Sequence, residues 1–220
     1  MFASASERVA VAERLATAIR PTAPASSRSL PVAEPLRCLL AGGALRRGTT
    51  VVVAGAPGRG ATSLGLALLA EASASGHWCA TVGLDDPGVV AMAELGVDLR
   101  RVVLVPRPRG AWAAATAELL EGVDVALVRL PARVAHTAAR RLHARARDRA
   151  AVLVVLCEHR DDWPVPAATT LEVTAATWHV AGRLTSRVSE VRAVGRGGDL
   201  RPRRASLWLP DPRGALSAAP

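Results

Sequence analysis

Short apolar runs and longer amphipathic segments alternate along the middle of this chain. The apolar runs are rich in valine and leucine, carry few charges, and are typical of strands that are buried on both faces. They occupy residues 50–54, 79–82, 102–105, 124–128 and 151–157. Helical patterns follow at residues 61–75, from the Asp86-Pro87 pair onward, at 111–121 and at 132–148. This alternation predicts an α/β fold with a mostly parallel sheet flanked by helices.

The pattern changes after Trp163. Runs that contain β-branched residues at 169–174, 177–181, 188–194 and 205–209 predict short strands joined by turns. We expect these strands to form an antiparallel C-terminal extension of the sheet. The final residues, 210–220, are predicted to be a loose C-terminal tail.

Residues 1–35 predict an N-terminal helical arm and a linker. Ser4 and Glu7 match a capping box, and the helix should continue to Arg20. Its apolar stripe is too narrow to form a core of its own, so we expect the arm to dock on another surface. The stripe consists of Val9, Ala12, Ala16 and Ile19. A proline- and serine-rich linker follows to residue 35, and the core should occupy residues 36–209.

The charge of the chain favours an acidic partner. The net charge is +9, and all 28 basic residues are arginine because the chain contains no lysine. Nucleic acid is the first candidate partner, although a soluble protein from a basic proteome would have the same composition. No uncharged apolar run approaches the ~18 residues of a membrane span. Glu7 and Arg8 in the first helix argue against a secretory signal, so we expect a cytoplasmic protein without a membrane contact.

Cysteine and histidine spacing gives no support for a metal site. Cys38, Cys79 and Cys157 are widely separated and form no CxxC pair, which favours buried, unreactive thiols. His136 and His143 are too far apart along one helix to hold one metal, so we interpret them as surface or packing residues. Trp163 is either an anchor at a protein interface or a cap at the edge of the core.

A glycine-rich motif lies between the strand at 50–54 and the helix at 61–75. It contains Gly55, Gly58, Arg59, Gly60, Ala61, Thr62 and Ser63. A phosphate-binding loop has two glycines separated by four residues, then lysine, then serine or threonine. Gly55, Gly60 and Thr62 match this template, but Ala61 stands in place of the lysine. The lost ammonium group would bind the β and γ phosphates, and such a charged hydrogen bond contributes about 1.5–3 kcal/mol.

The strand at 124–128 is followed by Arg129, where a phosphate-loop ATPase has the aspartate that holds magnesium. Arginine reverses the charge at this position and should not recruit a metal ion. Arg59 should point from the wrong side of the loop to replace the lysine. We therefore expect no ATPase activity, no cofactor and no bound metal. A glycine-rich turn kept only for its shape is the alternative interpretation of the loop.

Arginine residues crowd the helix at 132–148. A candidate anion- or partner-binding face consists of Arg133, Arg140, Arg141 and Arg145. Acidic partners at the i+4 positions are scarce, although a solvated helix face is the usual explanation for such a charge run. A second basic patch in the C-terminal part contains Arg183, Arg187, Arg192, Arg196, Arg201, Arg203 and Arg204.

Four segments resemble the core of the RecA family in their order and spacing. They are residues 42–48, the motif at 55–63, residues 76–80 and residues 95–99. The resemblance extends from about Leu36 to Gly195. In its degenerate motifs the chain is most similar to the actinobacterial ImuA-prime proteins, which are also described as SulA-like or RecA-like.

This resemblance implies a RecA-like core that has lost its catalytic groups. The glutamate that activates water in RecA corresponds to Asp85 or to its neighbour Asp86. Cys157-Glu158-His159 stands where RecA has a nucleotide-sensing glutamine. Both DNA-binding loops are short, so any contact with DNA should be weak, independent of sequence and strongly dependent on salt.

The resemblance also implies an accessory function in SOS-induced translesion DNA synthesis. ImuA-prime proteins work with ImuB and an error-prone C-family polymerase. We expect a non-enzymatic adaptor that contacts ImuB, and that contacts RecA or a second copy of itself through the N-terminal helix. Two alternatives are a weak ATP-dependent DNA recombinase that uses Arg59 in place of lysine, and a SulA-like inhibitor of cell division.

Overall fold

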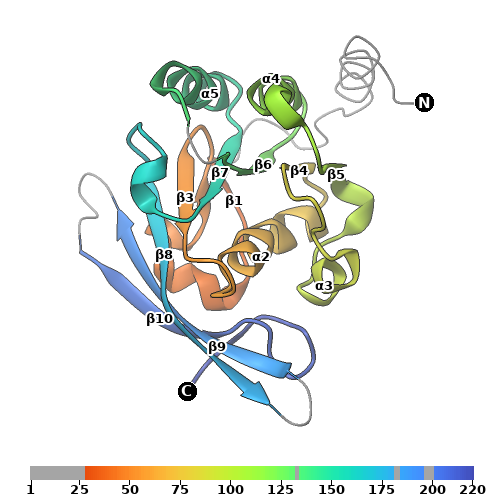
Figure 1. Ribbon diagram of the computed structural model, residues 1–220, viewed down its shortest axis with the longest axis vertical. Helices are drawn as coiled ribbons and strands as arrows, with labels where there is room; N and C mark the ends of the chain where they lie inside the picture. Colours follow the sequence, from red (N-terminus) through yellow and green to blue (C-terminus); the bar gives the residue numbers. More distant parts are fainter. Residues whose placement is uncertain (1–27, 132–133, 181–183, 196–200) are drawn as a thin grey trace.

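The computed structural model describes residues 28–131, 134–180, 184–195 and 201–220. They form an α/β structure in which helices flank a large, mostly parallel sheet (Figure 1). The predicted fold class is confirmed at this level. The N-terminal helix predicted at residues 4–20 lies outside the described residues.

The described part of the chain contains a nine-stranded sheet in the order β11-β10-β9-β8-β3-β7-β6-β4-β5. The strands of its parallel part are β3 (Thr50–Ala54), β4 (Cys79–Val82), β5 (Val102–Val105), β6 (Val125–Arg129) and β7 (Val152–Cys157). The sequence predicted all of them to within a residue at each end. β8 (Thr169–Val180) pairs parallel with β3 and antiparallel with β9 (Leu184–Gly195), so it joins the two halves of the sheet.

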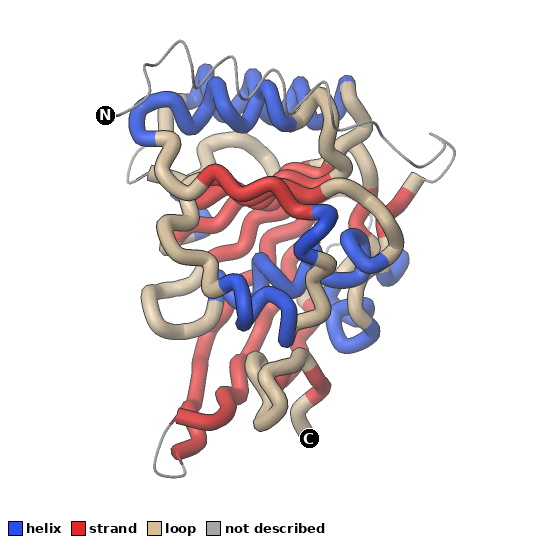
Figure 2. The backbone as a smooth tube through the Cα atoms, turned by 90° about the vertical axis from the view of Figure 1, so that its right-hand side faces the viewer, coloured by secondary structure: helices blue, strands red, loops and turns tan. Residues whose placement is uncertain are grey.

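Helices form a layer on each face of the sheet, and Figure 2 shows the strands between these layers. One layer contains α2 (Ala61–Ala74), α3 (Val89–Glu94) and the 3-10 helix Glu34–Leu39, together with the small sheet of β1 (Ser29–Leu30) and β2 (Leu45–Arg46). The other contains α4 (Trp112–Leu119), α5 (His136–Asp148) and the 3-10 helix Arg160–Asp162. Shorter 3-10 turns occupy Ala41–Gly43, Leu99–Arg101 and Arg109–Ala111.

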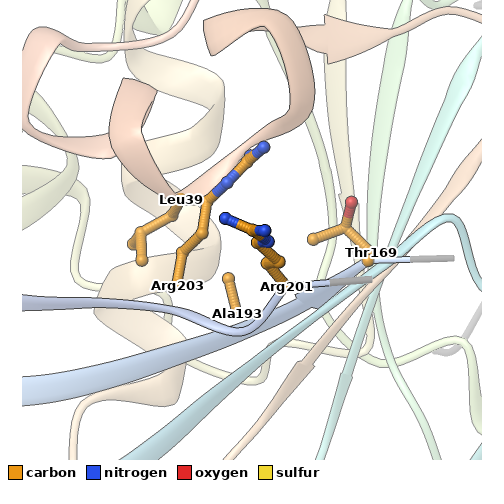
Figure 3. A pocket seen from close by; sticks show the side chains of 6 residues that line it. Leu39, Thr169, Ala193, Arg201 and Arg203 are labelled. Atoms are coloured by element: carbon orange, nitrogen blue, oxygen red, sulfur yellow. The ribbon is translucent and has the colours of Figure 1, made fainter. Parts of the chain in front are cut away.

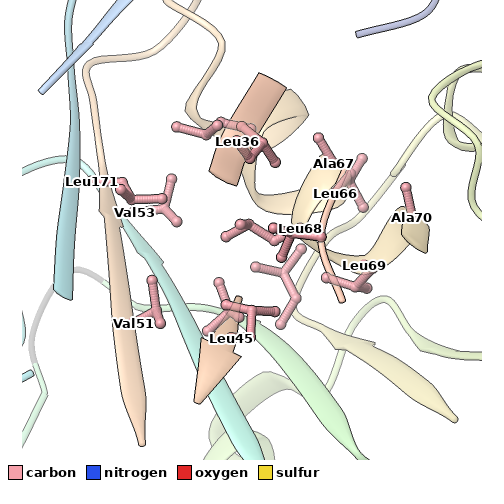
Figure 4. Packing of buried hydrophobic residues seen from close by; sticks show 14 of the residues in the cluster. Leu36, Leu45, Val51, Val53, Leu66, Ala67, Leu68, Leu69, Ala70 and Leu171 are labelled. Carbon is pink, nitrogen blue, oxygen red and sulfur yellow. The ribbon is translucent and has the colours of Figure 1, made fainter. Parts of the chain in front are cut away.

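Alternating residues of β3 separate the two cores. Val51 and Val53 belong to the cluster beneath α2, whereas Val52 and Ala54 belong to the cluster beneath α4 and α5. Figure 4 shows the first of these clusters, in which leucines of α2 and of the 3-10 helix Glu34–Leu39 pack over β3. Each fully buried leucine or valine side chain stabilises the fold by roughly 1.5–3 kcal/mol. The sheet is therefore a rigid support for the loops at its ends.

A buried ion pair fixes the amino ends of the parallel strands. Nη2 of Arg47 lies 2.7 Å from Oδ1 of Asp124, and both side chains are almost fully buried. Oδ2 of Asp124 accepts a hydrogen bond of 3.0 Å from the backbone amide of Trp78. The guanidinium of Arg47 also donates to the carbonyl of Ala150 at 3.3 Å. This cluster connects the segments that precede β3, β4, β6 and β7.

The C-terminal extension is antiparallel as predicted, but its strands are longer. The sequence predicted a turn between residues 174 and 177, and that prediction is wrong because β8 continues through it to Val180. An irregularity of register between Val173 and Ala175 absorbs the break in the pattern. β8 and β9 therefore form one long hairpin that projects from the sheet (Figure 1).

The chain beyond residue 209 is not a loose tail. β10 (Arg203–Trp208) pairs antiparallel with both β9 and β11 (Ser217–Ala218). Between them, Oδ1 of Asp211 accepts hydrogen bonds from the amides of Arg213 and Ala215 at 2.8 and 3.0 Å. The sequence predicted a loose tail here, but this turn and the strand pairing order the segment.

Several helices begin later than the sequence indicated. α3 starts at Val89 because the Asp86 carboxylate accepts from the amide of Gly88 and forms a local turn instead of an N-cap. α4 starts at Trp112 and α5 at His136. Within the described ranges, no helix is both long enough and apolar enough to cross a lipid bilayer.

Two residues with alternative interpretations have packing roles. Trp163 is 4% exposed and belongs to the core beneath α5, so the interpretation as a core-edge cap is confirmed and that of an interface anchor is wrong. Nδ1 of His143 lies 2.9 Å from the hydroxyl of Thr50, which confirms its packing role.

Candidate functional site

The glycine-rich loop (residues 55–60) lies between β3 and α2, at the carboxyl end of the parallel strands. The amide of Gly55 donates to the carbonyl of Cys157 at 3.2 Å, which fastens the loop to β7. Gly58 and Gly60 have φ values of +79° and +102°, which other residue types rarely adopt. The loop therefore has a shape that specifically requires glycine.

A pocket of about 190 Å³ opens beside this loop. Its walls are the loop, the first turn of α2, and the carboxyl ends of β6 and β7. The lining residues are Gly55, Ala56, Pro57, Gly58, Gly60, Ala61, Thr62, Arg129, Leu156, Cys157 and Glu158. Such a position, outside the carboxyl ends of neighbouring parallel strands, is where open α/β sheets bind ligands.

The lysine of a phosphate-binding loop has no replacement among the predicted candidates. Ala61 is the first residue of α2, and its side chain ends at Cβ. Nη1 of Arg59 donates to the carbonyl of Thr174 on β8 at 2.8 Å, and Arg59 does not line the pocket. The structure thus confirms that Arg59 points away from the lysine position.

Arg129 lies where the sequence predicted it, at the end of β6 on the wall of the pocket. Its Nη2 donates a hydrogen bond of 2.7 Å to the hydroxyl of Thr62. In a phosphate-loop ATPase the corresponding hydroxyl binds magnesium. Here the hydroxyl oxygen accepts from a cation, so the metal position carries positive charge.

Sequence reasoning missed the importance of Arg187, which it placed in a diffuse basic patch. Arg187 belongs to β9, is 5% exposed, and lies directly against Gly60. Its Nη2 donates to the hydroxyl of Ser63 at 3.1 Å, and its Nη1 lies 3.4 Å from the carbonyl of Gly58. The guanidinium carbon is 4.8 Å from the ring centre of Trp178, a cation–π distance.

Burial lowers the pKa of Arg187, because a desolvated guanidinium is less stable in its charged form. Its polar contacts named above are a hydroxyl and a carbonyl, and no carboxylate in the described residues forms an ion pair with it. Nε of Arg187 has no hydrogen-bond partner there. In addition to Arg129, the Arg187 guanidinium therefore contacts the glycine-rich loop and the first turn of α2, from the side of the C-terminal hairpin.

The family comparison covers the glycine-rich loop and the parallel sheet. A family model described as the MT3502 N-terminal domain matches residues 38–165, which is more than half of the chain. The chain belongs to this family. The MT3502 N-terminal domain includes Arg129 and ends before β8, so Arg187 reaches its loop from outside the matched region.

One protein that is similar to this chain comes from Mycobacterium tuberculosis. It is the uncharacterized protein Rv3395c, which is 37% identical over 97 residues. The matched part is 44% of this chain and 48% of that protein, so the comparison spans about half of the relative's length.

Cys157, which lines the glycine-loop pocket at the end of β7, is not an activated nucleophile. Burial raises the pKa of the Cys157 thiol to about 12, with a smaller contribution from the negative charge of Asp162. The thiol is therefore protonated near neutral pH and is a poor nucleophile. Asp85, the counterpart expected for a water-activating acid, does not line the pocket and makes an exposed ion pair with Arg107 at 3.9 Å.

The predicted arginine face on α5 is divided. Arg145 and Arg149 both form ion pairs with Glu121, so Arg145 is not available as predicted. Arg140 and Arg141 are exposed to solvent. Arg133 lies outside the described residues. The helix therefore presents a smaller basic face than the sequence indicated.

A shallow depression on the C-terminal sheet brings two further arginines together. Figure 3 shows Arg201 and Arg203 beside Leu39, Thr169 and Ala193. The depression has no room for even a water-sized molecule, so it is not a ligand pocket.

Proposed function

We propose that this chain is a non-catalytic, RecA-like accessory protein of damage-induced translesion DNA synthesis. It acts through protein–protein contacts with ImuB and, through ImuB, with an error-prone C-family polymerase. The proposal combines the resemblance to ImuA-prime proteins with the chemistry of the glycine-rich loop. The mycobacterial relative is compatible with it, since mycobacteria are actinobacteria.

One observation carries the non-catalytic part. Arg129 donates to the hydroxyl of Thr62, while Ala61 provides no ammonium group for a phosphate. A metal ion at Thr62 would meet the positive charge of Arg129 instead of a carboxylate, and ATP hydrolysis needs the metal to neutralise developing charge. The same geometry argues against a weak recombinase, because Arg59 is bonded to Thr174 and does not line the pocket.

ATP turnover tests the non-catalytic part directly. We expect no phosphate release from ATP and magnesium by the purified chain, with or without single-stranded DNA. DNA-stimulated turnover that disappears in Thr62→Val would contradict the proposal. Thr137→Val is a suitable control, because Thr137 is an exposed threonine on α5, far from the loop in sequence.

Association with ImuB tests the adaptor part. The full chain and ImuB from the same organism should elute as one complex in size-exclusion chromatography. Complex formation should not require ATP, because the loop has lost its phosphate-binding groups. Separate elution of the two proteins across a wide concentration range would contradict the adaptor function.

A further inference from the structure

Exposed apolar side chains lie on the described residues at both sides of the β8–β9 hairpin tip. Trp178, Val180 and Leu184 are 38%, 67% and 60% exposed, although all three are large apolar side chains. β8 pairs with β3 only as far as Glu172, so beyond the irregularity at residues 173–175 its one partner among the described strands is β9. Clustered apolar side chains of this kind mark interaction surfaces more often than isolated ones do.

A pocket of about 420 Å³ lies beneath the end of the hairpin. Trp178, Leu184 and Thr185 form the hairpin wall, and the turn after β10 forms the opposite wall with Pro210, Pro212, Arg213 and Gly214. Glu94 at the end of α3 closes the third side. Figure 1 shows the C-terminal chain between α3 and the end of the hairpin. The volume is in the range of about 300–1,000 Å³ that small ligand sites have.

Both walls of this pocket are held in place before any partner arrives. The Arg187 guanidinium packs on the Trp178 ring, and Arg187 also exchanges backbone hydrogen bonds with Leu209 and Pro210 at 2.7 and 2.9 Å. Asp211 fixes the turn through the amides of Arg213 and Ala215. A preorganised tryptophan loses little conformational entropy on binding, which is why such residues are common energetic hot spots.

The rim of the pocket indicates the chemistry of its occupant. Arg213 lies on one side and makes no ion pair with a carboxylate in the described residues. Glu94 packs against Gly214 of the same turn, where an added Cβ would lie 2.5 Å from its Oε2, and Val90, one helical turn before Glu94, is 73% exposed. With a net charge of +9, the chain as a whole attracts acidic partners. A partner segment with an apolar side chain next to an acidic one would therefore complement both residues: the apolar side chain would pack on Leu184, and the acidic one would pair with Arg213.

We infer that this surface, formed by Trp178, Leu184 and Thr185 of the hairpin, the turn at residues 210–214 and Glu94 at the end of α3, binds a segment of a partner protein. The segment carries a large apolar side chain beside an acidic one. The apolar side chain enters the pocket against Trp178 and Leu184, and the acidic side chain pairs with Arg213. The inference rests on the proposed adaptor function for its choice of a protein as the partner.

A peptide-display experiment tests the inference on the full chain. Short random peptides would be selected on the purified protein, and the enriched peptides would be synthesised with a fluorescent label. We expect enrichment of an apolar residue next to aspartate or glutamate. Leu184→Ser and Arg213→Glu should each weaken binding by roughly tenfold or more. Matched controls are Leu104→Ser on the edge strand β5 and Arg46→Glu on β2, two exposed positions outside the proposed surface, which should leave binding unchanged.

Exchanging the charges of the peptide and of residue 213 tests their pairing directly. A peptide whose acidic residue is replaced by lysine should lose affinity for the native chain and regain it with Arg213→Glu. Enriched peptides that bind Leu184→Ser and Arg213→Glu as tightly as the native chain would overturn the inference. Both substituted residues lie at the surface, and an unchanged melting temperature would show that the variants are folded.

Other occupants give distinct outcomes, each of which overturns the inference. Stronger binding of an oligo-dT strand than of any peptide, lost in Leu184→Ser, would make the surface a nucleic-acid site. A change in oligomeric state of the same variant would show that a second copy covers it. Peptide affinity that rises when residues 1–27 are deleted would assign the surface to the chain's own N-terminal segment.

The test also separates this inference from the proposed function. Native-like association of ImuB with a Val180→Ser, Leu184→Ser, Arg213→Glu variant would overturn the inference and leave the adaptor function standing. Absence of any complex between ImuB and the native chain would contradict the adaptor function, while the peptide result would still identify the surface.

Discussion

Arg187 donates a hydrogen bond to the hydroxyl of Ser63, a residue 124 positions earlier in the chain. This contact joins the C-terminal hairpin to the first turn of the helix that follows the glycine-rich loop. A guanidinium without a carboxylate partner, buried beside the N-terminus of a helix, is electrostatically unfavourable. It is tolerated here because Trp178, Ser63 and the Gly58 carbonyl surround it.

Gly60→Ala should destabilise the protein more than Gly58→Ala. Both residues have positive φ, so each substitution strains the backbone by about 1–3 kcal/mol. At Gly60 the added Cβ would also lie 2.6 Å from Cζ of Arg187, whereas at Gly58 it would meet no described atom within 4 Å. Urea denaturation of the two variants measures the difference. The double variant Gly60→Ala, Arg187→Ala should recover part of the loss, and equal destabilisation of the single variants would contradict this account.

Asp124→Asn should strongly reduce the free energy of unfolding. The substitution removes the charge that pairs with buried Arg47, and breaking a buried pair typically costs about 3–5 kcal/mol. Asp148→Asn is the control, since its ion pair with Arg147 is largely exposed and should contribute little. Thermal and chemical denaturation of both variants would test the comparison. Similar losses in the two variants would show that the buried pair has no special role.

The thiols should differ in reactivity. The interpretation of the three thiols as buried is wrong for Cys38, which is exposed, and is confirmed for Cys79 and Cys157. Burial raises the pKa of both buried thiols, that of Cys157 to about 12. A thiol reagent at about pH 8 should therefore modify one cysteine quickly in the native protein and all three in denaturant. Rapid modification of Cys38→Ser would contradict this prediction.

The same thiols make stability depend on alkaline pH. The unfolded chain releases the Cys157 proton from pH 9.0 upward, while the folded chain keeps it until about 12. The folded state then binds more protons than the unfolded state, so the free energy of unfolding falls as pH rises through this interval. Cys157→Ala should show a shallower decline than the native chain in denaturation curves recorded across that range.

Removing residues 1–27 should leave the core folded and weaken association with RecA or with a second copy. The cut must stop at residue 27, because β1 begins at Ser29 and Leu30 is fully buried. Melting temperature and pull-down of RecA, compared between the full and shortened chains, measure the two properties. A large drop in melting temperature would instead make this segment part of the core.

The sequence by itself determined the parallel strands, the glycine-rich loop and the two substitutions at Ala61 and Arg129. These features are local: a buried strand reveals itself by continuous apolar residues, and a phosphate-type loop by glycine spacing. Local signals also placed Arg59 outside the pocket, which its bond to Thr174 confirms.

Only the tertiary structure decided which arginine touches the loop. Arg187 reaches Gly58 and Ser63 because β9 pairs with β8, and β8 with β3, so three strands carry a distant residue beside the loop. No periodicity in the chain distinguishes Arg187 from its arginine neighbours. Glu121, in the turn after α4, likewise pairs with Arg145 of α5. The ordered turn at Asp211 depends on hydrogen bonds from the amides of Arg213 and Ala215 to the Asp211 carboxylate, which composition does not encode. Pairings between distant segments depend on packing of the whole sheet, which is why they emerge only in the folded chain.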